Sequence, residues 1–119
     1  MNYGEAVRAR VATARFRGEL ESESVRFEAS NPVCGDVVRI ALNISGGKIR
    51  EARWKASGCP PTLAASDVLA EMIVGLTVKE AQAIASEDVV ATLPGLPRTS
   101  FHAAEVAVEA LRGALQALD

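Results

Sequence analysis

Four side chains in this sequence could bind a metal ion or act as nucleophiles, namely those of Cys34, Asp36, Cys59 and His102. Two thiols, a carboxylate and an imidazole are a sufficient ligand set for a tetrahedral metal, and thiolates suit iron, zinc and iron–sulfur clusters. The chain has two cysteines and one histidine in all, and it contains neither a CxxC pair nor a zinc-finger histidine spacing. Residue type therefore indicates a metal site more strongly than spacing does.

Each of these residues also has a purely structural explanation. A cysteine in a small domain often packs as a small buried hydrophobe. An aspartate in a loop, such as Asp36, often forms a turn. A histidine at the start of a helix, such as His102, is often a surface or capping residue. The choice between these explanations depends on which elements carry the four side chains.

Three segments with alternating apolar and polar residues predict three strands, at 25–29, 38–44 and 49–57. In the third segment Ala52, Trp54 and Ala56 are expected to point inward. The Ser45-Gly46-Gly47-Lys48 sequence between the second and third segments predicts a tight hairpin turn, because glycine accepts the backbone angles such turns require. We therefore expect a small antiparallel sheet.

Apolar residues at spacings of three and four predict helices before and after these strands. A first helix is expected within residues 1–17, with four arginines on its solvated faces (Arg8, Arg10, Arg15 and Arg17). Further helices are expected to start at Pro60-Pro61, at the capping-box sequence Thr77-Val78-Lys79-Glu80, and at Ser86-Glu87-Asp88. The proline-containing segment 93–97 should precede a long last helix over residues 101–118.

Together these elements predict an α+β domain. We expect a three-stranded antiparallel sheet with an N-terminal helix and C-terminal helices packed on one face, and a single domain over residues 1–119. Cys34 and Asp36 then fall between the first two strands, Cys59 falls between the third strand and a helix, and His102 begins the last helix. A helix N-terminus favours negative charge, which would favour the thiolate form of Cys59.

Composition excludes several classes of protein. A net charge of −2 argues against a protein that coats nucleic acid, and two cysteines exclude a disulfide-stapled scaffold. No stretch of about 18 apolar residues is present, and the N-terminus lacks an apolar run, so we expect neither a membrane span nor a signal peptide. The expected location is the cytoplasm, with both thiols reduced.

The sequence around the four side chains resembles the NifU/IscU-type iron–sulfur cluster assembly scaffold proteins. Asn31–Val37 (NPVCGDV) is similar to their first cysteine motif, and Trp54–Cys59 (WKASGC) is similar to the segment with their second cysteine. Leu96–His102 (LPRTSFH) resembles the region that carries a Leu-Pro chaperone-recognition motif, a histidine and then the third cysteine. The resemblance covers nearly the whole chain and agrees with the predicted order of elements.

The resemblance implies a role for each residue. Cys34 and Cys59 stand where the family places two thiolate ligands for a nascent 2Fe–2S cluster, and Asp36 matches an aspartate that keeps cluster binding labile. His102 matches the histidine beside the third thiolate. The implied function is assembly of a cluster and its transfer to acceptor apoproteins, with sulfur from a cysteine desulfurase-type donor and without enzymatic turnover. Formation of a homodimer is also left open by the sequence.

The chain departs from the family pattern at Ala103, where the third cysteine is expected. Two interpretations follow. Cys34, Asp36, Cys59 and His102 could form a four-ligand site for iron, zinc or an unusual cluster, or the chain could be a degenerate relative that acts as a metal-free interaction module or a zinc-binding regulator. Arg98, Thr99 and Ser100 also replace the usual continuation of the chaperone motif, so we do not expect handover by the usual co-chaperone system. Pro60-Pro61 stiffens the segment after Cys59.

Two other functions receive less support. A thiol enzyme or redox switch could use Cys34 and Cys59 as a pair with His102 as base, but no nucleophile signature accompanies them. A nucleic-acid site could use the basic residues near Trp54, which are Lys48, Arg50, Arg53 and Lys55. Their alternation with apolar residues is more typical of the solvated face of a strand.

Overall fold

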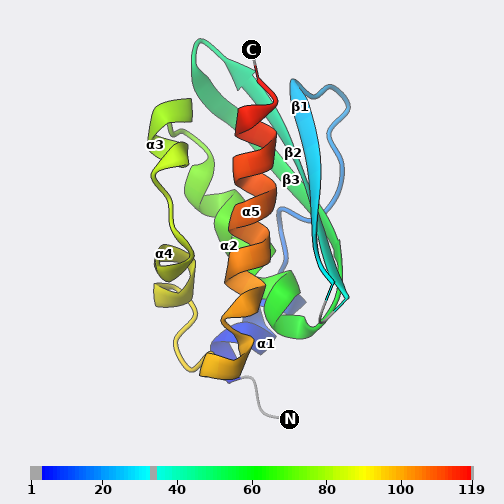
Figure 1. Cartoon of the computed structure of the whole chain (residues 1–119), viewed down its shortest axis with the longest axis vertical. Helices are drawn as coiled ribbons and strands as arrows, with labels where there is room; N and C mark the ends of the chain where they lie inside the picture. The colour runs from blue at the N-terminus through cyan, green and yellow to red at the C-terminus, as the bar shows by residue number, and fades with distance from the viewer. Residues whose placement is uncertain (1–3, 33–34, 119) are drawn as a thin grey trace.

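The computed structural model describes residues 4–32 and 35–118 of the 119-residue chain. Figure 1 shows a sheet with helices against one of its faces. The elements in chain order are α1 (Glu5–Ala12), β1 (Val25–Asn31), β2 (Asp36–Ser45), β3 (Lys48–Ser57), α2 (Pro60–Ile73), α3 (Val78–Gln82), α4 (Ser86–Ala91), the 3₁₀ turn η1 (Arg98–Ser100) and α5 (His102–Gln116). The predicted fold class, an α+β arrangement with a three-stranded antiparallel sheet, is confirmed.

The strands pair in the order β1-β2-β3, and both pairings are antiparallel. Alternate residues of β2 face the core, where Val38, Ile40 and Leu42 are buried. A register shift opposite Asn43 and Ile44 leaves one extra residue in β3. Such a bulge changes which residues share a face of the sheet. It explains why Ile49 and Ala52, three positions apart, are both fully buried.

Helices α2 and α5 lie along the inner face of the sheet (Figure 1). The apolar positions of α5 form one buried stripe that includes Val108, Leu111 and Leu115. Helix α2 is buried over most of its length because it packs against β3, α1 and α5. At its end Gly75 adopts a φ of +93°, a left-handed conformation that favours glycine, as expected for a helix stop.

The starts of the short helices agree with the capping signals. The Thr77 hydroxyl accepts a hydrogen bond from the Glu80 amide at 3.0 Å, and the Glu80 carboxylate accepts one from the Thr77 amide at 2.9 Å. The hydrogen bond from the Thr77 backbone amide, with a smaller contribution from the Thr77 side chain, lowers the pKa of Glu80. In the next helix Asp88 accepts a hydrogen bond from the Ala85 amide at 2.8 Å.

The predicted length of the N-terminal helix is wrong. Helix α1 ends at Ala12, and the following residues run beside the outer edge of β3. There the Trp54 amide donates to the Phe16 carbonyl at 3.0 Å, and the Gly18 amide donates to the Trp54 carbonyl at 2.8 Å. An edge strand has unpaired backbone groups, and satisfying them favours an extended segment over another helical turn.

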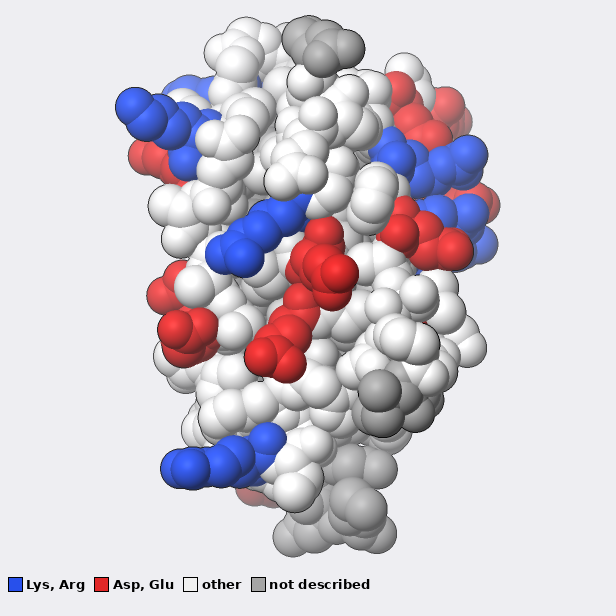
Figure 2. All heavy atoms as spheres, viewed as in Figure 1, with Lys and Arg blue, Asp and Glu red and all other residues white. Residues whose placement is uncertain are grey.

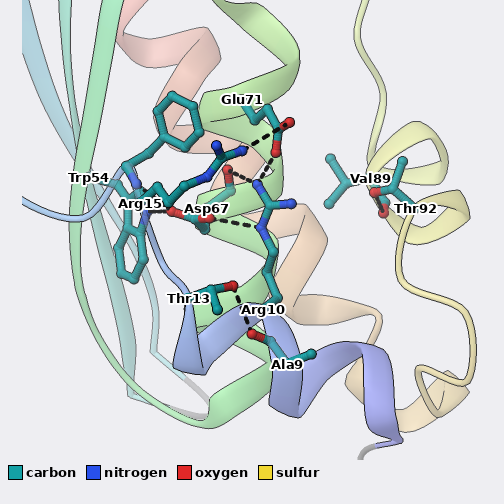
Figure 3. Close-up of polar contacts among 10 residues, drawn as sticks. Ala9, Arg10, Thr13, Arg15, Trp54, Asp67, Glu71, Val89 and Thr92 are labelled. Carbon is teal, nitrogen blue, oxygen red and sulfur yellow. Dashed lines mark hydrogen bonds and ion pairs between the residues drawn. The ribbon is translucent and has the colours of Figure 1, made fainter.

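Asp67 of α2 explains a second difference from the sequence-based expectation (Figure 3). Its buried carboxylate accepts hydrogen bonds from the Phe16 amide and the Trp54 indole, both at 2.9 Å, and from Nε of Arg10 at 2.8 Å. Arg10 also pairs with Glu71. The prediction that Arg10 lies on a solvated face is therefore wrong, because this side chain connects α1 to α2.

Two carboxylates raise the pKa of Arg10. Burial by itself would lower its pKa, but hydrogen bonds with Glu71 and Asp67 and the charges of both groups outweigh burial and raise it. The positive charge of Arg10 thus faces the buried carboxyl group of Asp67, which it contacts at 2.8 Å.

Charged side chains of both signs occur in separate small groups on the face shown in Figure 2, with uncharged surface between them. This face does not present the continuous positive field that nucleic-acid binding requires. Within residues 4–32 and 35–118, no helix is both long and apolar enough to cross a membrane.

Candidate metal centre

The pairing of β2 with β3 brings Asp36 and Cys59 to one end of the sheet. Asp36 begins β2, and the next residue, Val37, pairs with Ser57, the last residue of β3. Cys59 follows two residues later as the N-cap of α2. The chain thus places a carboxylate at the start of one strand beside a thiol at the end of its neighbour.

Helix α5 supplies the third group. His102 is its first residue, after the 3₁₀ turn η1. Figure 1 shows that α5 and α2 both begin toward the end of the molecule where β3 finishes. Ligand atoms of Asp36, Cys59 and His102 all lie within 4.8 Å of one another, a separation that a shared metal ion can span. Of the four predicted site residues the structure brings these three together, and Cys34 lies outside the described residues.

The Asp36 carboxylate is the buried centre of this cluster. Its side chain is 3% exposed, and Oδ1 accepts a long hydrogen bond of 3.4 Å from the Cys59 amide. Oδ2 is buried and accepts no hydrogen bond of normal geometry from the described residues, although Nε2 of His102 lies 3.2 Å away and forms an ion pair with it when the imidazole is protonated. A buried carboxylate oxygen without a partner is costly, and a cation bound to it would remove that cost.

The imidazole of His102 faces the same oxygen. Its Nε2 lies 3.2 Å from Oδ2 of Asp36, and its Nδ1 lies 3.1 Å from the Thr99 carbonyl. A carbonyl can only accept, so this second contact is a hydrogen bond only if Nδ1 carries the proton. In the neutral ring Nε2 then presents a lone pair toward Oδ2. Two acceptors at this distance suit a cation shared between them, which is either a proton on Nε2 or a metal ion, and a carbonyl that orients a histidine in this way is common at metal sites.

Two further residues shape the site, and the sequence patterns did not single them out. A Cβ atom on Gly58 would overlap Oδ1 of Asp36, so glycine at position 58 leaves room for the carboxylate. The Thr62 hydroxyl lies 3.3 Å from Sγ of Cys59. The usable sequence signals were a glycine directly before the cysteine and a threonine three positions after it, in the first turn of a helix.

The site is accessible from solvent on one side. The His102 side chain is 25% exposed and Cys59 is half-buried, whereas Asp36 is almost fully covered. Next to His102, Ala103 is completely buried in the hydrophobic core and supplies no ligand atom. The described cluster is therefore a mixed set of one thiol, one carboxylate and one imidazole.

The sequence and the fold are both similar to known proteins. The family model for the NifU-like N-terminal domain matches residues 2–119. The chain is 31% identical over 113 residues to the iron–sulfur cluster assembly scaffold protein IscU 1 of Archaeoglobus fulgidus, covering 95% of this chain and 74% of that protein. It is 34% identical over 85 residues to the scaffold protein IscU of Escherichia coli K12, covering 71% of this chain and 66% of that protein.

Solved structures share the fold at lower sequence identity. A NifU-like protein (N-terminal part) from Brucella abortus superposes with a TM-score of 0.75 at 16% identity, over 96% of this chain and 92% of that one. A candidate cluster-assembly scaffold of the SUF system from Fervidobacterium islandicum gives a TM-score of 0.76 at 21% identity, over 95% and 96% of the two chains. By its sequence match over residues 2–119, this chain belongs to the NifU-like N-terminal domain family, whose relatives include the IscU scaffold proteins.

Proposed function

We propose that this protein is an iron–sulfur cluster assembly scaffold that binds iron or a 2Fe–2S cluster as cargo and passes it to acceptor proteins. The proposed ligands are Asp36, Cys59, His102 and Cys34, which precedes Asp36 by two positions in the chain. The scaffold role is supported by the relatives from Archaeoglobus fulgidus and Escherichia coli, which are iron–sulfur cluster assembly scaffold proteins. In this proposal residues 1–119 act as one domain in the cytoplasm, a cysteine desulfurase-type protein supplies sulfur, and the protein itself catalyses no turnover.

One observation carries this proposal. Oδ2 of Asp36 is buried without a hydrogen-bond partner among the described residues, and Nε2 of His102 and Sγ of Cys59 are close enough to share a cation with it. A structural carboxylate would be expected to accept short hydrogen bonds on both oxygens, as Asp67 does, whereas Asp36 accepts one long hydrogen bond on Oδ1. The arrangement therefore supports metal binding better than a purely structural role.

The ligand set also fits cargo that must leave again. Thiolates bind the iron of iron–sulfur clusters strongly, whereas a carboxylate oxygen is a harder and more readily exchanged ligand. His102 lies at the solvent-accessible side of the cluster, where an incoming ligand from an acceptor can compete with it. With Ala103 in place of a third thiolate, cargo held here should be more labile than cargo held by three cysteines.

A zinc-binding regulator is the second candidate, and the chemistry of the ligand set favours it. Sulfur, nitrogen and oxygen donors in one small cluster are a normal tetrahedral environment for Zn²⁺. Zinc and iron are distinguished by analysis of the metal that the protein carries and by the presence of sulfide, because zinc sites contain none.

The test is the metal and sulfide content of the protein, purified without air and then reconstituted with Fe²⁺ and sulfide. We expect iron and sulfide in the wild-type protein, their loss in Cys59→Ser, and an altered rate of cargo release in Asp36→Asn. Glu109→Gln is the matched control, because it also removes one carboxylate charge but lies on the exposed side of α5. Zinc without sulfide would support the second candidate. Metal-free protein under all these conditions would refute both.

A further inference from the structure

Thr62 has a feature that the proposed ligand set does not use. Its side chain is completely buried in the first turn of α2, and its hydroxyl contacts Sγ of Cys59 at 3.3 Å. A buried hydroxyl needs a hydrogen-bond partner, and Sγ is the partner it has within the described part of the chain. The contact therefore connects a buried position of the helix to the thiol at its N-cap.

The start of α2 makes this hydroxyl the local donor to the thiol. Pro60 and Pro61 occupy the first two helical positions and have no backbone N–H. The next two amides, those of Thr62 and Leu63, donate to the Cys59 carbonyl at 2.9 and 3.3 Å. The first-turn amides that commonly stabilise an anion at a helix N-terminus are thus missing or already used.

Chemistry fixes the direction of the hydrogen bond when metal is bound. A cysteine that ligates a metal is a thiolate and has no proton to donate. The Thr62 hydroxyl must then be the donor, and Sγ must be the acceptor. Such a hydrogen bond stabilises the negative charge on sulfur and restricts rotation of the Cys59 side chain.

We propose that Thr62 is a positioning residue for Cys59, whose hydroxyl takes the place of the helix amides that Pro60 and Pro61 cannot supply. It holds Sγ toward Asp36 and His102 and donates to the sulfur in the loaded state. This inference rests on the proposed function, because it assigns Cys59 as a ligand. Outer partners of metal ligands typically contribute about 10- to 100-fold to metal affinity.

The test uses Co²⁺ as a spectroscopic probe in the full-length protein. In Thr62→Val, which keeps the shape and removes the hydroxyl, Co²⁺ affinity should fall about tenfold or more. The thiolate-to-cobalt charge-transfer band should also move to lower energy, because the sulfur charge loses its hydrogen bond. Thr62→Ser should restore both properties. Ser66→Ala is the matched control, since it removes a buried hydroxyl of the same helix that donates to the Thr62 carbonyl and does not contact Cys59.

A second measurement separates this inference from the proposed function. In metal-free protein, Hα–Hβ coupling constants measured by NMR should show one Cys59 rotamer in the wild type and in Thr62→Ser, and averaging in Thr62→Val. A wild-type protein without a charge-transfer band would overturn the metal site, and the coupling constants would still decide the role of Thr62. A Thr62→Val protein that matches the wild type in band, affinity and couplings would overturn the role of Thr62 alone.

Discussion

Oδ2 of Asp36 and Nε2 of His102 lie 3.2 Å apart, although the two residues begin different elements, β2 and α5. The sheet register fixes the first atom and the packing of α5 fixes the second. Their separation is thus a property of the whole fold. Changes that leave the fold intact but alter either atom should therefore act on metal binding alone.

Replacement of His102 by alanine tests this directly. We expect Zn²⁺ or Co²⁺ affinity to fall roughly a hundredfold, because loss of a direct ligand should cost at least as much as loss of an outer partner. The half-buried side chain makes a small contribution to the core, so thermal stability without metal should change little. Thr99→Ala is the control, because the carbonyl that contacts the ring remains in place. Equal affinities in a metal titration would remove His102 from the site.

Replacement of Gly58 by alanine should disturb the site through Asp36. The added methyl group would occupy the space of Oδ1, so the carboxylate must turn away and lose its contact with the Cys59 amide. We expect weaker metal binding than in the wild type. Ser57→Ala is a suitable neighbouring control, since residue 57 is exposed at the end of β3. A titration in which Gly58→Ala binds Co²⁺ like the wild type would contradict this account.

Asp67 should affect the stability of the fold and should not affect metal binding. Asp67 accepts hydrogen bonds from Arg10, Phe16 and Trp54, and Asp67→Asn removes the carboxylate that accepts them. This change should lower the free energy of unfolding by about 3 kcal/mol or more. Glu71→Gln removes the other carboxylate beside Arg10. Because the Glu71 side chain is 45% exposed, this change should lower the free energy of unfolding by under about 1 kcal/mol. Urea denaturation measures both. Equal losses in the two variants would show that burial of Asp67 is not the cause.

The capping box at Thr77 predicts a pH dependence of stability. The pKa of Glu80 is lowered in the folded protein, so its carboxylate form stabilises the fold above the usual glutamate value of 4.5. That stabilisation is lost as the pH falls through the lower, folded-state pKa. Glu80→Gln keeps an acceptor and removes the titration. Its melting temperature should lie below that of the wild type at pH 7, and the gap should close in acid. A gap that is constant with pH would speak against this assignment.

Ala103 offers a gain-of-function test. Ala103→Cys places a thiol where the family resemblance expects the third cysteine, and we expect a reconstituted cluster to survive a chelator longer than in the wild type. Because position 103 is completely buried, the larger side chain should also cost about 1 kcal/mol of stability or more. Absorbance decay of the cluster and urea denaturation provide the two measurements. Identical decay rates would show that a thiol at this position cannot reach the cargo.

The sequence predicted the elements better than the contacts between them. Alternation located β2 and β3, and the capping box at Thr77 and the proline-containing segment 93–97 located helix starts, because these patterns depend on neighbours in the chain. The end of α1 at Ala12 was not predicted, since it depends on the backbone needs of β3 far along the sequence. Asp67 was missed for the same reason.

In the candidate site, too, the sequence predicted the residues better than the contacts between them. Residue type and the resemblance to the scaffold family singled out four residues, Cys34, Asp36, Cys59 and His102. The fold brings ligand atoms of the last three within 4.8 Å of one another. The space at Gly58 and the contact of Thr62 with Cys59 depend on distances between side chains. No periodicity encodes such distances, so they emerge only from the three-dimensional structure.

The pairing of residues 16–18 with β3 has a consequence for self-association. These residues satisfy backbone groups of Trp54 at the outer edge of the sheet. If the N-terminal segment were removed, that part of β3 would offer free donors and acceptors to any extended chain, including a strand from another copy. Residues 16–18 thus cover these backbone groups in the folded chain, and Asp67 holds them there by accepting a hydrogen bond from the Phe16 amide.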